Sequence, residues 1–468
     1  MFKTKKKFLV AFLSLIVGAQ YSCKKDIPET ESVITTEEMY SAGTASTTAD
    51  MIQTSDGGYI MVGTSYANND PHGDIVAIKT DSRGVQQWST SMGKAAHQGT
   101  GSLAGYTVNY QEEGAKVVEE LDGSFSIAGN RTYHAYANPN STSSGIRKQT
   151  KIVLYKLSAT GTATTTDGIE LRSNTEFTDQ ISDFKIDASN GSTQYILTGY
   201  TTDVQVNKPN GSNNGLDDLT DIFTVSLDAS FNVMWSTSSL AYGFSGQDYG
   251  TSIQILPTGY LVVGTSEERT SVTSFNSRII AVVFEKTGGT PMNVAYFANQ
   301  GSEFESGYSV YDATNQLITI VGNIVGVSAS HGQMAVLQIN DNLVQTLPSS
   351  TSSNFEFINP TPPSTTHAGN TFKASSIALI PNNGGFVISS TLSHTLGKDI
   401  CITKLASDFS LPATGWPHYY GLADGFYSNQ KAVGPVLPIV NVNGTVEYAY
   451  TGTFKANTTS TKIGWVLF

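Results

Sequence analysis

The chain has 468 residues, of which 44 are glycine and only 14% are charged, well below the roughly 25% of an average globular protein. Its formal net charge of −12 becomes −16 without the four lysines of the first 22 residues. Such a surface repels phosphate backbones, which argues against a nucleic-acid partner. Apolar residues alternate or form short runs between turn residues, as in all-β proteins, and no stretch has the period of a long amphipathic helix.

The N-terminus predicts export. Lysines at positions 3 and 5–7 precede the apolar run Phe8–Val17, which is too short to span a bilayer but suits the core of a signal peptide. With Ser22 before it, Cys23 resembles the lipidation site of a Bacteroidetes-type lipoprotein signal. That resemblance implies a signal peptide over 1–22, a lipidated Cys23 and a polar tether over 23–32. The residue at position 20 is Gln rather than the usual aliphatic residue, which leaves open ordinary cleavage after Ala19 and an unmodified thiol at position 23.

A repeated phrase dominates the rest of the chain. Asp56–Gly63 reads Asp-Gly-Gly-Tyr-Ile-Met-Val-Gly, and worn copies end in a small residue at positions 129, 199, 264, 322, 390 and 452. The spacing is about 65 residues, and a fixed period of this kind indicates a repeat architecture.

Each unit predicts four strands. An apolar segment precedes the phrase, the phrase forms the second strand after a two-residue turn, and a third strand such as Asp74–Lys79 follows a connection of variable length. A fourth strand is marked by Trp88, Trp235 or Trp416, which we expect to pack between blades. Four-stranded antiparallel units repeated seven times predict a single seven-bladed β-propeller.

The chain ends predict how the ring closes. The seventh unit reaches Phe468 within its third strand, and residues near 33–42 have the position of a missing outer strand. We therefore expect the N-terminal strand to complete the last blade, so that the propeller covers 33–468 and no sheet edge is left open. Cys401, in an alternating strand pattern, is expected to be a small buried hydrophobic residue.

The repeat resembles those of bacterial secreted β-propeller proteins. These carry Asp-Gly-Gly-Tyr-aliphatic-x-x-Gly, then Asp-aliphatic-x-aliphatic-x-Lys, then a strand with Trp. The resemblance covers residues 33–468 and is best in units one, two, four and six. It implies the fold and says little about activity.

The long connections are expected on one face of the ring, opposite the short Gly-Gly turns. They include 131–150, 202–220, 345–372 and 412–430, and long loops on a rigid scaffold commonly carry binding sites. All seven histidines are expected in these connections, either as ligand-binding residues or as ordinary solvated residues; the ligand-binding candidates are His134, His331, His394 and His418. No two histidines have metal-ligand spacing, so a metal could be bound only by residues distant in sequence.

Carboxylates and tyrosines supply the remaining candidates. Glu113, Asp248 and Glu305 precede inner strands, with Tyr249 and Tyr308 nearby. We expect them around the mouth of the central channel that the ring of blades encloses. There they could bind a cation or a basic group or act on a glycan, or they could simply accept hydrogen bonds from backbone amides between blades. Tyr419 and Tyr420 could stack on sugars or on a protein, or pack the loops together.

These patterns favour binding over catalysis. The sequence has no phosphate loop, nucleophile elbow or calcium loop, so no catalytic residue and no cofactor is assigned. We predict an exported, outer-membrane lipoprotein that binds a glycan or protein ligand on its long-loop face and touches the membrane only through its lipid. The alternative is a carbohydrate-active enzyme, a glycoside hydrolase or polysaccharide lyase, with its site at the channel mouth.

Overall fold

The computed structural model describes most of the chain from residue 36 onward. The described residues are 36–40, 43, 45–66, 72–98, 106–136, 145–165, 167–172, 178–189, 191–202, 220–237, 246–269, 275–298, 303–325, 333–348, 355–358, 360, 371–394, 397–413, 415–420, 431–441, 443–455 and 461–468. The predicted signal peptide, Cys23 and the tether lie outside these ranges, as does His331.

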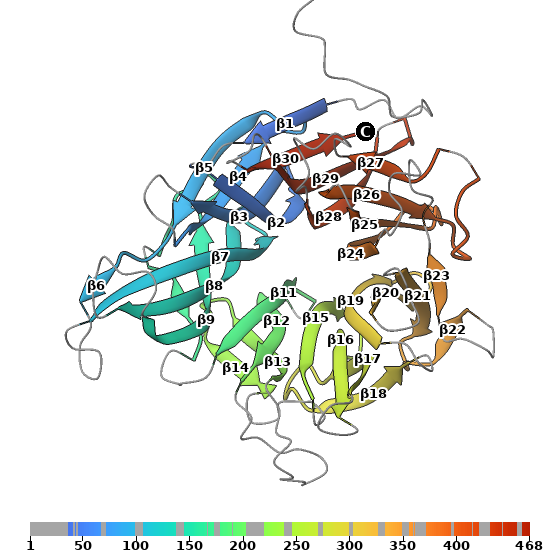
Figure 1. Ribbon diagram of the computed structural model, residues 1–468, viewed down its shortest axis with the longest axis horizontal. Coiled ribbons are helices and arrows are strands. Elements are labelled where there is room, and N and C mark those ends of the chain that lie inside the picture. Colours follow the sequence, from blue (N-terminus) through green and yellow to red (C-terminus); the bar gives the residue numbers. More distant parts are fainter. Residues whose placement is uncertain are drawn as a thin grey trace, which may run out of the picture.

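The strands form seven antiparallel sheets arranged in a ring, which is the predicted seven-bladed β-propeller (Figure 1). Blade 1 consists of β2 (Ala45–Gln53), β3 (Tyr59–Tyr66), β4 (Asp74–Thr80) and β5 (Gln86–Met92). Blade 2 consists of β6 (His97–Gln98), β7 (Thr107–Glu119), β8 (Phe125–Tyr136), β9 (Gly145–Leu157) and β10 (Ile169–Glu170). Blade 3 consists of β11 (Asp179–Asp187), β12 (Gln194–Thr201), β13 (Asp221–Asp228) and β14 (Val233–Ser236).

The second half of the ring repeats this order. Blade 4 consists of β15 (Asp248–Ile255), β16 (Tyr260–Arg269), β17 (Phe275–Phe284) and β18 (Pro291–Phe297). Blade 5 consists of β19 (Glu303–Asp312), β20 (Leu317–Val325), β21 (Gln333–Asn340), β22 (Gln345–Leu347) and β23 (Glu356–Ile358). Blade 6 consists of β24 (Thr371–Leu379), β25 (Phe386–His394), β26 (Gly397–Leu405) and β27 (His418–Tyr420). Blade 7 consists of β28 (Lys431–Val440), β29 (Val446–Lys455), β30 (Thr461–Leu467) and β1 (Thr36–Tyr40).

The N-terminal strand closes the ring as predicted. β1 pairs antiparallel with β30, from Thr36 opposite Leu467 to Tyr40 opposite Ile463. The Tyr40 hydroxyl donates a hydrogen bond to the carbonyl oxygen of Gly84 in blade 1 (2.5 Å). Because β1 comes from the start of the chain, blade 7 joins its two ends.

The repeated phrase forms a tight turn and a buried strand. Gly57 has φ +81°, and a Cβ on Gly58 would lie 2.2 Å from the carbonyl oxygen of Thr80, so both positions require glycine. Asp56 accepts a hydrogen bond from the Gly58 amide (2.9 Å) and pairs with Lys79 from the third strand (2.9 Å). The apolar run that follows is buried along nearly all of β3, because both faces of each blade are covered by neighbouring blades.

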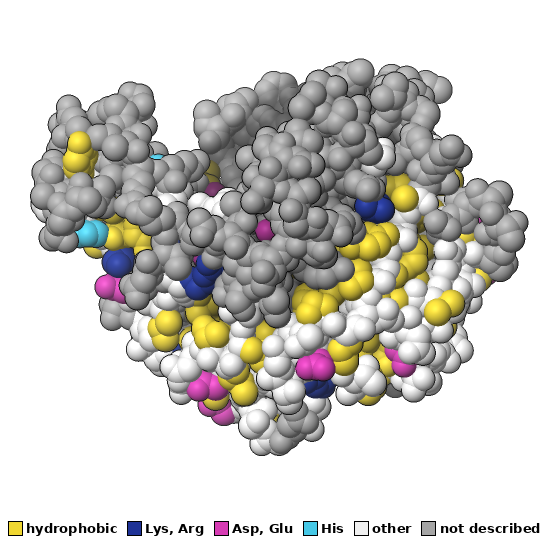
Figure 2. All heavy atoms as spheres, turned by 90° about the horizontal axis from the view of Figure 1, so that it is seen from below, with side chains coloured by type: hydrophobic (Ala, Val, Ile, Leu, Met, Phe, Trp, Pro, Cys, Tyr) yellow, Lys and Arg dark blue, Asp and Glu magenta, His cyan; other side chains and the backbone are white. Residues whose placement is uncertain are grey.

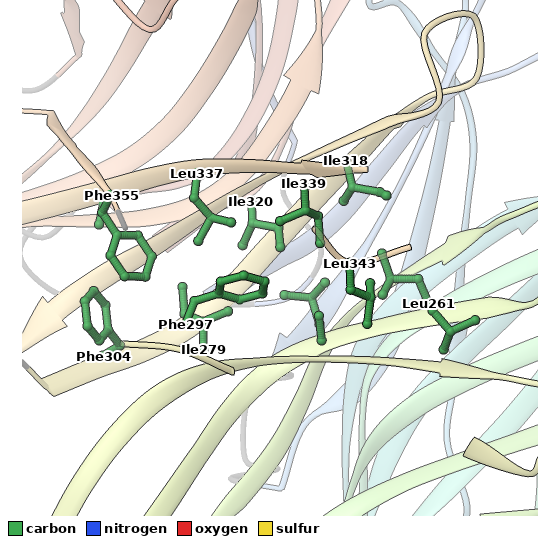
Figure 3. Close-up of a cluster of buried hydrophobic side chains, with 14 of the residues drawn as sticks. Leu261, Ile279, Phe297, Phe304, Ile318, Ile320, Leu337, Ile339, Leu343 and Phe355 are labelled. Carbon is green, nitrogen blue, oxygen red and sulfur yellow. The ribbon is translucent and has the colours of Figure 1, made fainter. Parts of the chain in front are cut away.

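The hydrophobic core lies between the blades. Each of the seven pairs of adjacent blades is joined by one cluster of buried side chains among the described residues. In the cluster between blades 4 and 5, Leu261 and Ile279 face Ile320 and Leu337 (Figure 3). Since every blade is needed to cover its neighbours, stability depends on the closed ring.

The three tryptophans pack between blades and Cys401 is buried, as expected, but Trp416 precedes the fourth strand of blade 6, β27, instead of lying in it. Trp88 and Trp235 donate indole hydrogen bonds to carbonyl oxygens of the next blade, those of Ala159 (3.2 Å) and Lys286 (2.8 Å). Trp416 packs on Tyr448 and Phe468 of blade 7. The Cys401 thiol is free and fully buried.

The histidine prediction is wrong in part. His97, His134, His394 and His418 belong to strands β6, β8, β25 and β27 rather than to connections. The physical reason is that strand pairing in blade 2 and at the edge of blade 6 continues into stretches whose composition predicts loops. The carboxylates Glu113, Asp248 and Glu305 likewise lie within inner strands, not before them.

Candidate functional site

Seven inner strands surround the ring axis: β2, β7, β11, β15, β19, β24 and β28 (Figure 1). Each repeated phrase ends in a small residue on the second strand of its blade. In six blades, the inner-strand residue that pairs with the position just before this small residue is polar or charged. We call these six the channel ring; they are Asp50, Lys116, Asp183, Ser252, Tyr308 and Ser376. In five of the six strands a β-bulge immediately precedes this position, and bulges re-aim side chains.

The charged members of the channel ring are paired with one another. The Lys116 ammonium lies 3.3 Å from Asp50 Oδ1 and 3.9 Å from Asp183 Oδ1. The two carboxylates come from blades 1 and 3, on either side of the lysine in blade 2. Their side chains are 8% and 7% exposed, and that of Lys116 is 25% exposed. One cation therefore serves two carboxylates near the axis.

The same carboxylates also join neighbouring blades. Asp50 Oδ2 accepts a hydrogen bond from the Val117 amide of blade 2 (3.1 Å), and Asp183 Oδ2 accepts one from the Ile253 amide of blade 4 (2.8 Å). The Ser252 hydroxyl oxygen likewise accepts a hydrogen bond from the Ser309 amide of blade 5 (3.2 Å). This is the backbone-binding role that the sequence left open for its carboxylates, carried out by different residues.

Electrostatics extend this cluster across the axis. Burial by itself would lower the pKa of Lys116, but Asp50 and Asp183 raise it above its usual range. Burial raises the pKa of Asp50, and Lys116 opposes that rise. Burial also raises the pKa of Tyr308, in blade 5, and Lys116 and Lys373 oppose it. Among the predicted residues, Tyr308 is thus one whose electrostatic environment includes Lys116.

A second cluster lies in blade 2, whose strands are the longest described. β7, β8 and β9 have 13, 12 and 13 residues, and no other described strand exceeds 10. We call Thr107–Glu113, Asn130–Tyr136 and Gly145–Lys151 the blade 2 extension; Figure 1 shows these strands reaching far out from the axis. The extension continues the sheet beyond the closing glycine, Gly129.

A buried arginine holds the extension together. Arg131, 1% exposed, donates to Glu112 (2.5 Å), Tyr155 (2.7 Å) and the Asp167 carbonyl oxygen (2.5 Å), and also to Glu170. The Tyr155 hydroxyl in turn donates to Glu112 (2.8 Å). The guanidinium thus ties the two-residue strand β10 to β7, β8 and β9 with charge-assisted hydrogen bonds.

Aromatic and basic side chains cover this network. The Tyr133 hydroxyl donates to Glu170, and the Tyr133 ring lies edge-on to Tyr110 with centroids 5.1 Å apart. The exposed His97 ring stacks on Tyr110 at 5.6 Å, with 2.9 Å between its Nδ1 and the tyrosine hydroxyl. The Lys94 ammonium lies 5.0 Å from the Tyr110 ring centroid. Burial raises the pKa of Tyr110 to about 12, so the phenol is neutral at physiological pH.

Three predicted residues share one register level at the long-loop edge. Glu113, Tyr249 and Glu305 each pair with the residue after a closing glycine. Glu113 is exposed and accepts a hydrogen bond from Gln111 (2.8 Å). Tyr249 lies edge-on to Tyr200 with centroids 5.1 Å apart and donates to Gln247. The side chain of Glu305 lies outside the described residues.

The other predicted residues are dispersed. Asp248 is fully buried, and the His134 ring lies 5.4 Å from that of His72. His418 and Tyr419 are in β27, the outermost strand of blade 6, at the perimeter rather than the mouth. His418 packs edge-on to Trp416 at 4.3 Å, and burial lowers its pKa. The side chains of His394 and Tyr420 are outside the described residues.

Sequence reasoning missed the charged residues of both clusters. Asp50, Lys116 and Asp183 each interrupt an apolar first strand in three consecutive units, with alternating sign, and this was a usable signal. No comparable sequence signal marks Arg131 and Glu170, because they are 39 positions apart in the chain and meet only through β10.

No metal-binding arrangement occurs among the described residues, where no three His, Cys, Asp or Glu side chains are grouped to hold an ion. In the same ranges there is no helix long and apolar enough to cross a membrane. The two clusters can bind charged, hydroxyl-bearing or aromatic groups, and neither contains an activated nucleophile.

Comparison with known proteins does not identify a family for this chain. No protein-family model matches the chain, and no curated protein matches it. Among solved structures it is similar to the Dos1 propeller, with TM-score 0.41, 10% identity and coverage of 92% of this chain and 94% of that one. It is also similar to extracellular domains 1-2 of Drosophila Semaphorin 1a, with TM-score 0.37, 9% identity and coverage of 94% and 88%. An N-acetylgalactosamine deacetylase from F. plautii in complex with blood group B trisaccharide matches with TM-score 0.34, 9% identity and coverage of 73% and 85%. All three scores are below 0.5, so these matches say nothing about ligand or activity.

Proposed function

We propose that this propeller is a cell-envelope lipoprotein that binds a glycan or protein ligand without chemical turnover, using the blade 2 extension on its long-loop face. The observation that carries the proposal is the basic and aromatic surface of that extension, where exposed His97 and partly exposed Lys94 and Tyr133 lie around the Tyr110 ring, itself only 6% exposed. Aromatic rings offer a large and rigid contact area, which suits sugars and protein surfaces alike.

Rigidity supports this choice of surface. The buried Arg131 network fixes β10 and the tyrosines before any ligand arrives, so little side-chain entropy is lost on binding. A binding surface needs only this pre-organisation. A catalytic site needs, in addition, groups whose protonation states differ.

One observation favours the enzyme as the second candidate. Asp50 and Asp183 lie within 4 Å of the same ammonium, as two carboxylates near a channel axis. Against hydrolysis, each carboxylate also accepts a backbone hydrogen bond from a neighbouring blade. Both are therefore occupied by the protein, in similar surroundings.

A screen of residues 24–468 against a glycan array and crude polysaccharides, scored for both binding and product release, separates the candidates. We expect binding without turnover, and we expect His97→Ala with Lys94→Ala to weaken it about tenfold or more. Thr160→Ala, an exposed change at the opposite edge of the same blade, is the matched control and should bind as the wild type does. Turnover that is abolished by Asp183→Asn in a folded protein would establish the enzyme instead.

A further inference from the structure

The face opposite the long loops is built from tight turns. In blade 1 the register places Gln53 opposite Tyr59 and Thr80 opposite Gln86, so the first and the third hairpin turns share one edge. The same order in the other blades puts their corresponding turns on this edge. We call this the short-loop face.

This face carries a ring of exposed apolar side chains. Ten large hydrophobic residues are exposed among the described residues. Met39 and Ile169 are elsewhere, and Met234 directly follows Val233 in β14. In blades 1, 3, 4, 5 and 6 the exposed residue is in or just after the turn between third and fourth strands: Val85, Val233, Met292, Val344 and Leu411. Blades 2 and 7 contribute Leu121 and Val440 next to their first turns. These seven residues are the apolar rim; the exposure of Leu121 is 87% and that of Val344 is 59%.

The N-terminal segment reaches the ring at the same face. Thr36 pairs with Leu467, and Leu467 with Ala449, beside the turn that ends β28. In blade 7 the start of β1 thus takes the place of the third turn of the other blades. Cys23 precedes Thr36 by 13 positions, a chain length that spans at most about 45 Å.

We propose that the lipid-anchored protein faces the bilayer with its short-loop face, so that the apolar rim contacts the lipid headgroup region and the blade 2 extension points away from the membrane. This inference rests on the lipidation of Cys23 that belongs to the proposed function. The anchor brings this face towards the membrane, because the N-terminal strand enters the ring there. The apolar rim can contact the lipid, because exposed apolar side chains partition into the interfacial region of a bilayer.

Charge determines which lipids suit this face. Aspartates cap its turns, among them Asp122, Asp228 and Asp408, and turn hydrogen bonds lower the pKa of each. They are therefore ionised at neutral pH. Figure 2, a side view of the ring, shows acidic side chains interspersed with hydrophobic ones on the described surface. We therefore expect contact with zwitterionic lipid to be closer than with anionic lipid, and salt to reduce the difference.

Fluorophores on the two faces test the orientation. Lipidated full-length protein carrying Thr160→Cys on the short-loop face, or Gln98→Cys in β6, is labelled and placed on phosphatidylcholine vesicles with nitroxide headgroups. Cys401 does not interfere, because burial keeps its thiol inaccessible and raises its pKa to about 11. We expect quenching several-fold stronger at position 160 than at position 98. Half phosphatidylglycerol should weaken the quenching at position 160.

A rim variant makes the test specific. Val85→Ser with Val344→Ser and Leu411→Ser changes only exposed side chains, and should reduce quenching at position 160 without changing the melting temperature. Equal or reversed quenching at the two positions would overturn the proposal. So would a dimer of the Cys23→Ser protein that buries position 160, because a second copy would then cover the rim. Mass spectrometry showing no lipid on Cys23 would remove the premise, while the ligand screen on residues 24–468 would stand unaffected.

Discussion

At the residue scale, the channel ring shows why a paired charge can be structural and still sensitive to pH. Lys116 holds two carboxylates that also bind backbone amides, so removing it leaves Asp50 and Asp183 close together and largely buried. An uncompensated buried charge is among the more costly defects in a protein. Asp183→Asn or Asp50→Asn should reduce the free energy of unfolding by less than loss of Lys116, because the lysine keeps one carboxylate partner.

Lys116→Met should lower the free energy of unfolding by roughly 1–3 kcal/mol at pH 7. The loss of stability should shrink as the pH falls towards 4. Burial raises the pKa of Asp50 in the folded state, so its carboxyl is protonated there at a higher pH than in the unfolded chain, which removes the unpaired charge. Urea unfolding of both proteins at the two pH values checks this. A deficit that stays constant would show that the lysine acts through packing alone.

Asp187 should show the opposite pH behaviour. Burial is offset by hydrogen bonds from Ser189, Lys286 and Tyr260, which lower its pKa to about 2 and link blade 3 to blade 4. Its contribution is therefore complete above the unfolded pKa near 4 and lost as the pH falls towards 2. Asp187→Asn should cost roughly 1–2 kcal/mol at pH 6 and almost nothing at pH 2. A cost independent of pH would contradict the ion pair's role.

At the element scale, short strands decide how the ring and the extension hold together. β1 has five residues and β10 has two, yet one closes the ring and the other caps blade 2. Each relies on distant contacts: β1 on the Tyr40 hydrogen bond to blade 1, and β10 on the Arg131 guanidinium.

Removing β1 should open the ring. A chain that begins at residue 41 exposes the edge of β30, and we expect it to melt several degrees lower and to associate as its concentration rises. A chain that begins at residue 34 keeps β1 and is the matched control. Scanning calorimetry and light scattering make the comparison, and identical behaviour of the two chains would show that β1 is dispensable.

Arg131→Met should loosen the blade 2 extension. The change keeps most of the side-chain volume but leaves Glu112 buried without its cation, at a cost of roughly 3–5 kcal/mol. Hydrogen exchange should accelerate in β9 and β10 and remain unchanged in blades 4 to 6. Uniform acceleration around the ring would mean that the network stabilises the whole propeller.

At the scale of the whole molecule, the sequence predicted the architecture because every blade repeats the same local rules. The Asp56 turn, the apolar second strand and the closing β1 strand are all visible in the chain, and the structure confirms them. Whether the predicted candidate residues bind a ligand stays a prediction. The clusters in the channel and on blade 2 were less accessible, because their residues come from several blades and meet only after the ring has closed.

The repeat also separates the two faces by role. The glycine turns that identify the repeat occupy the short-loop face, while the blade 2 extension departs from the pattern. If the short-loop face lies against the membrane, the extension is the part of the described chain best placed to meet a ligand.

The most direct test of the binding proposal is a titration of the ligand found by the screen against three forms of residues 24–468. They are the wild type, the His97→Ala and Lys94→Ala double variant, and the Thr160→Ala control. We expect the dissociation constant of the double variant to rise about tenfold or more, at unchanged melting temperature, while the control matches the wild type. Equal affinity of all three proteins would show that the ligand binds elsewhere and would rule out the blade 2 extension as the binding surface.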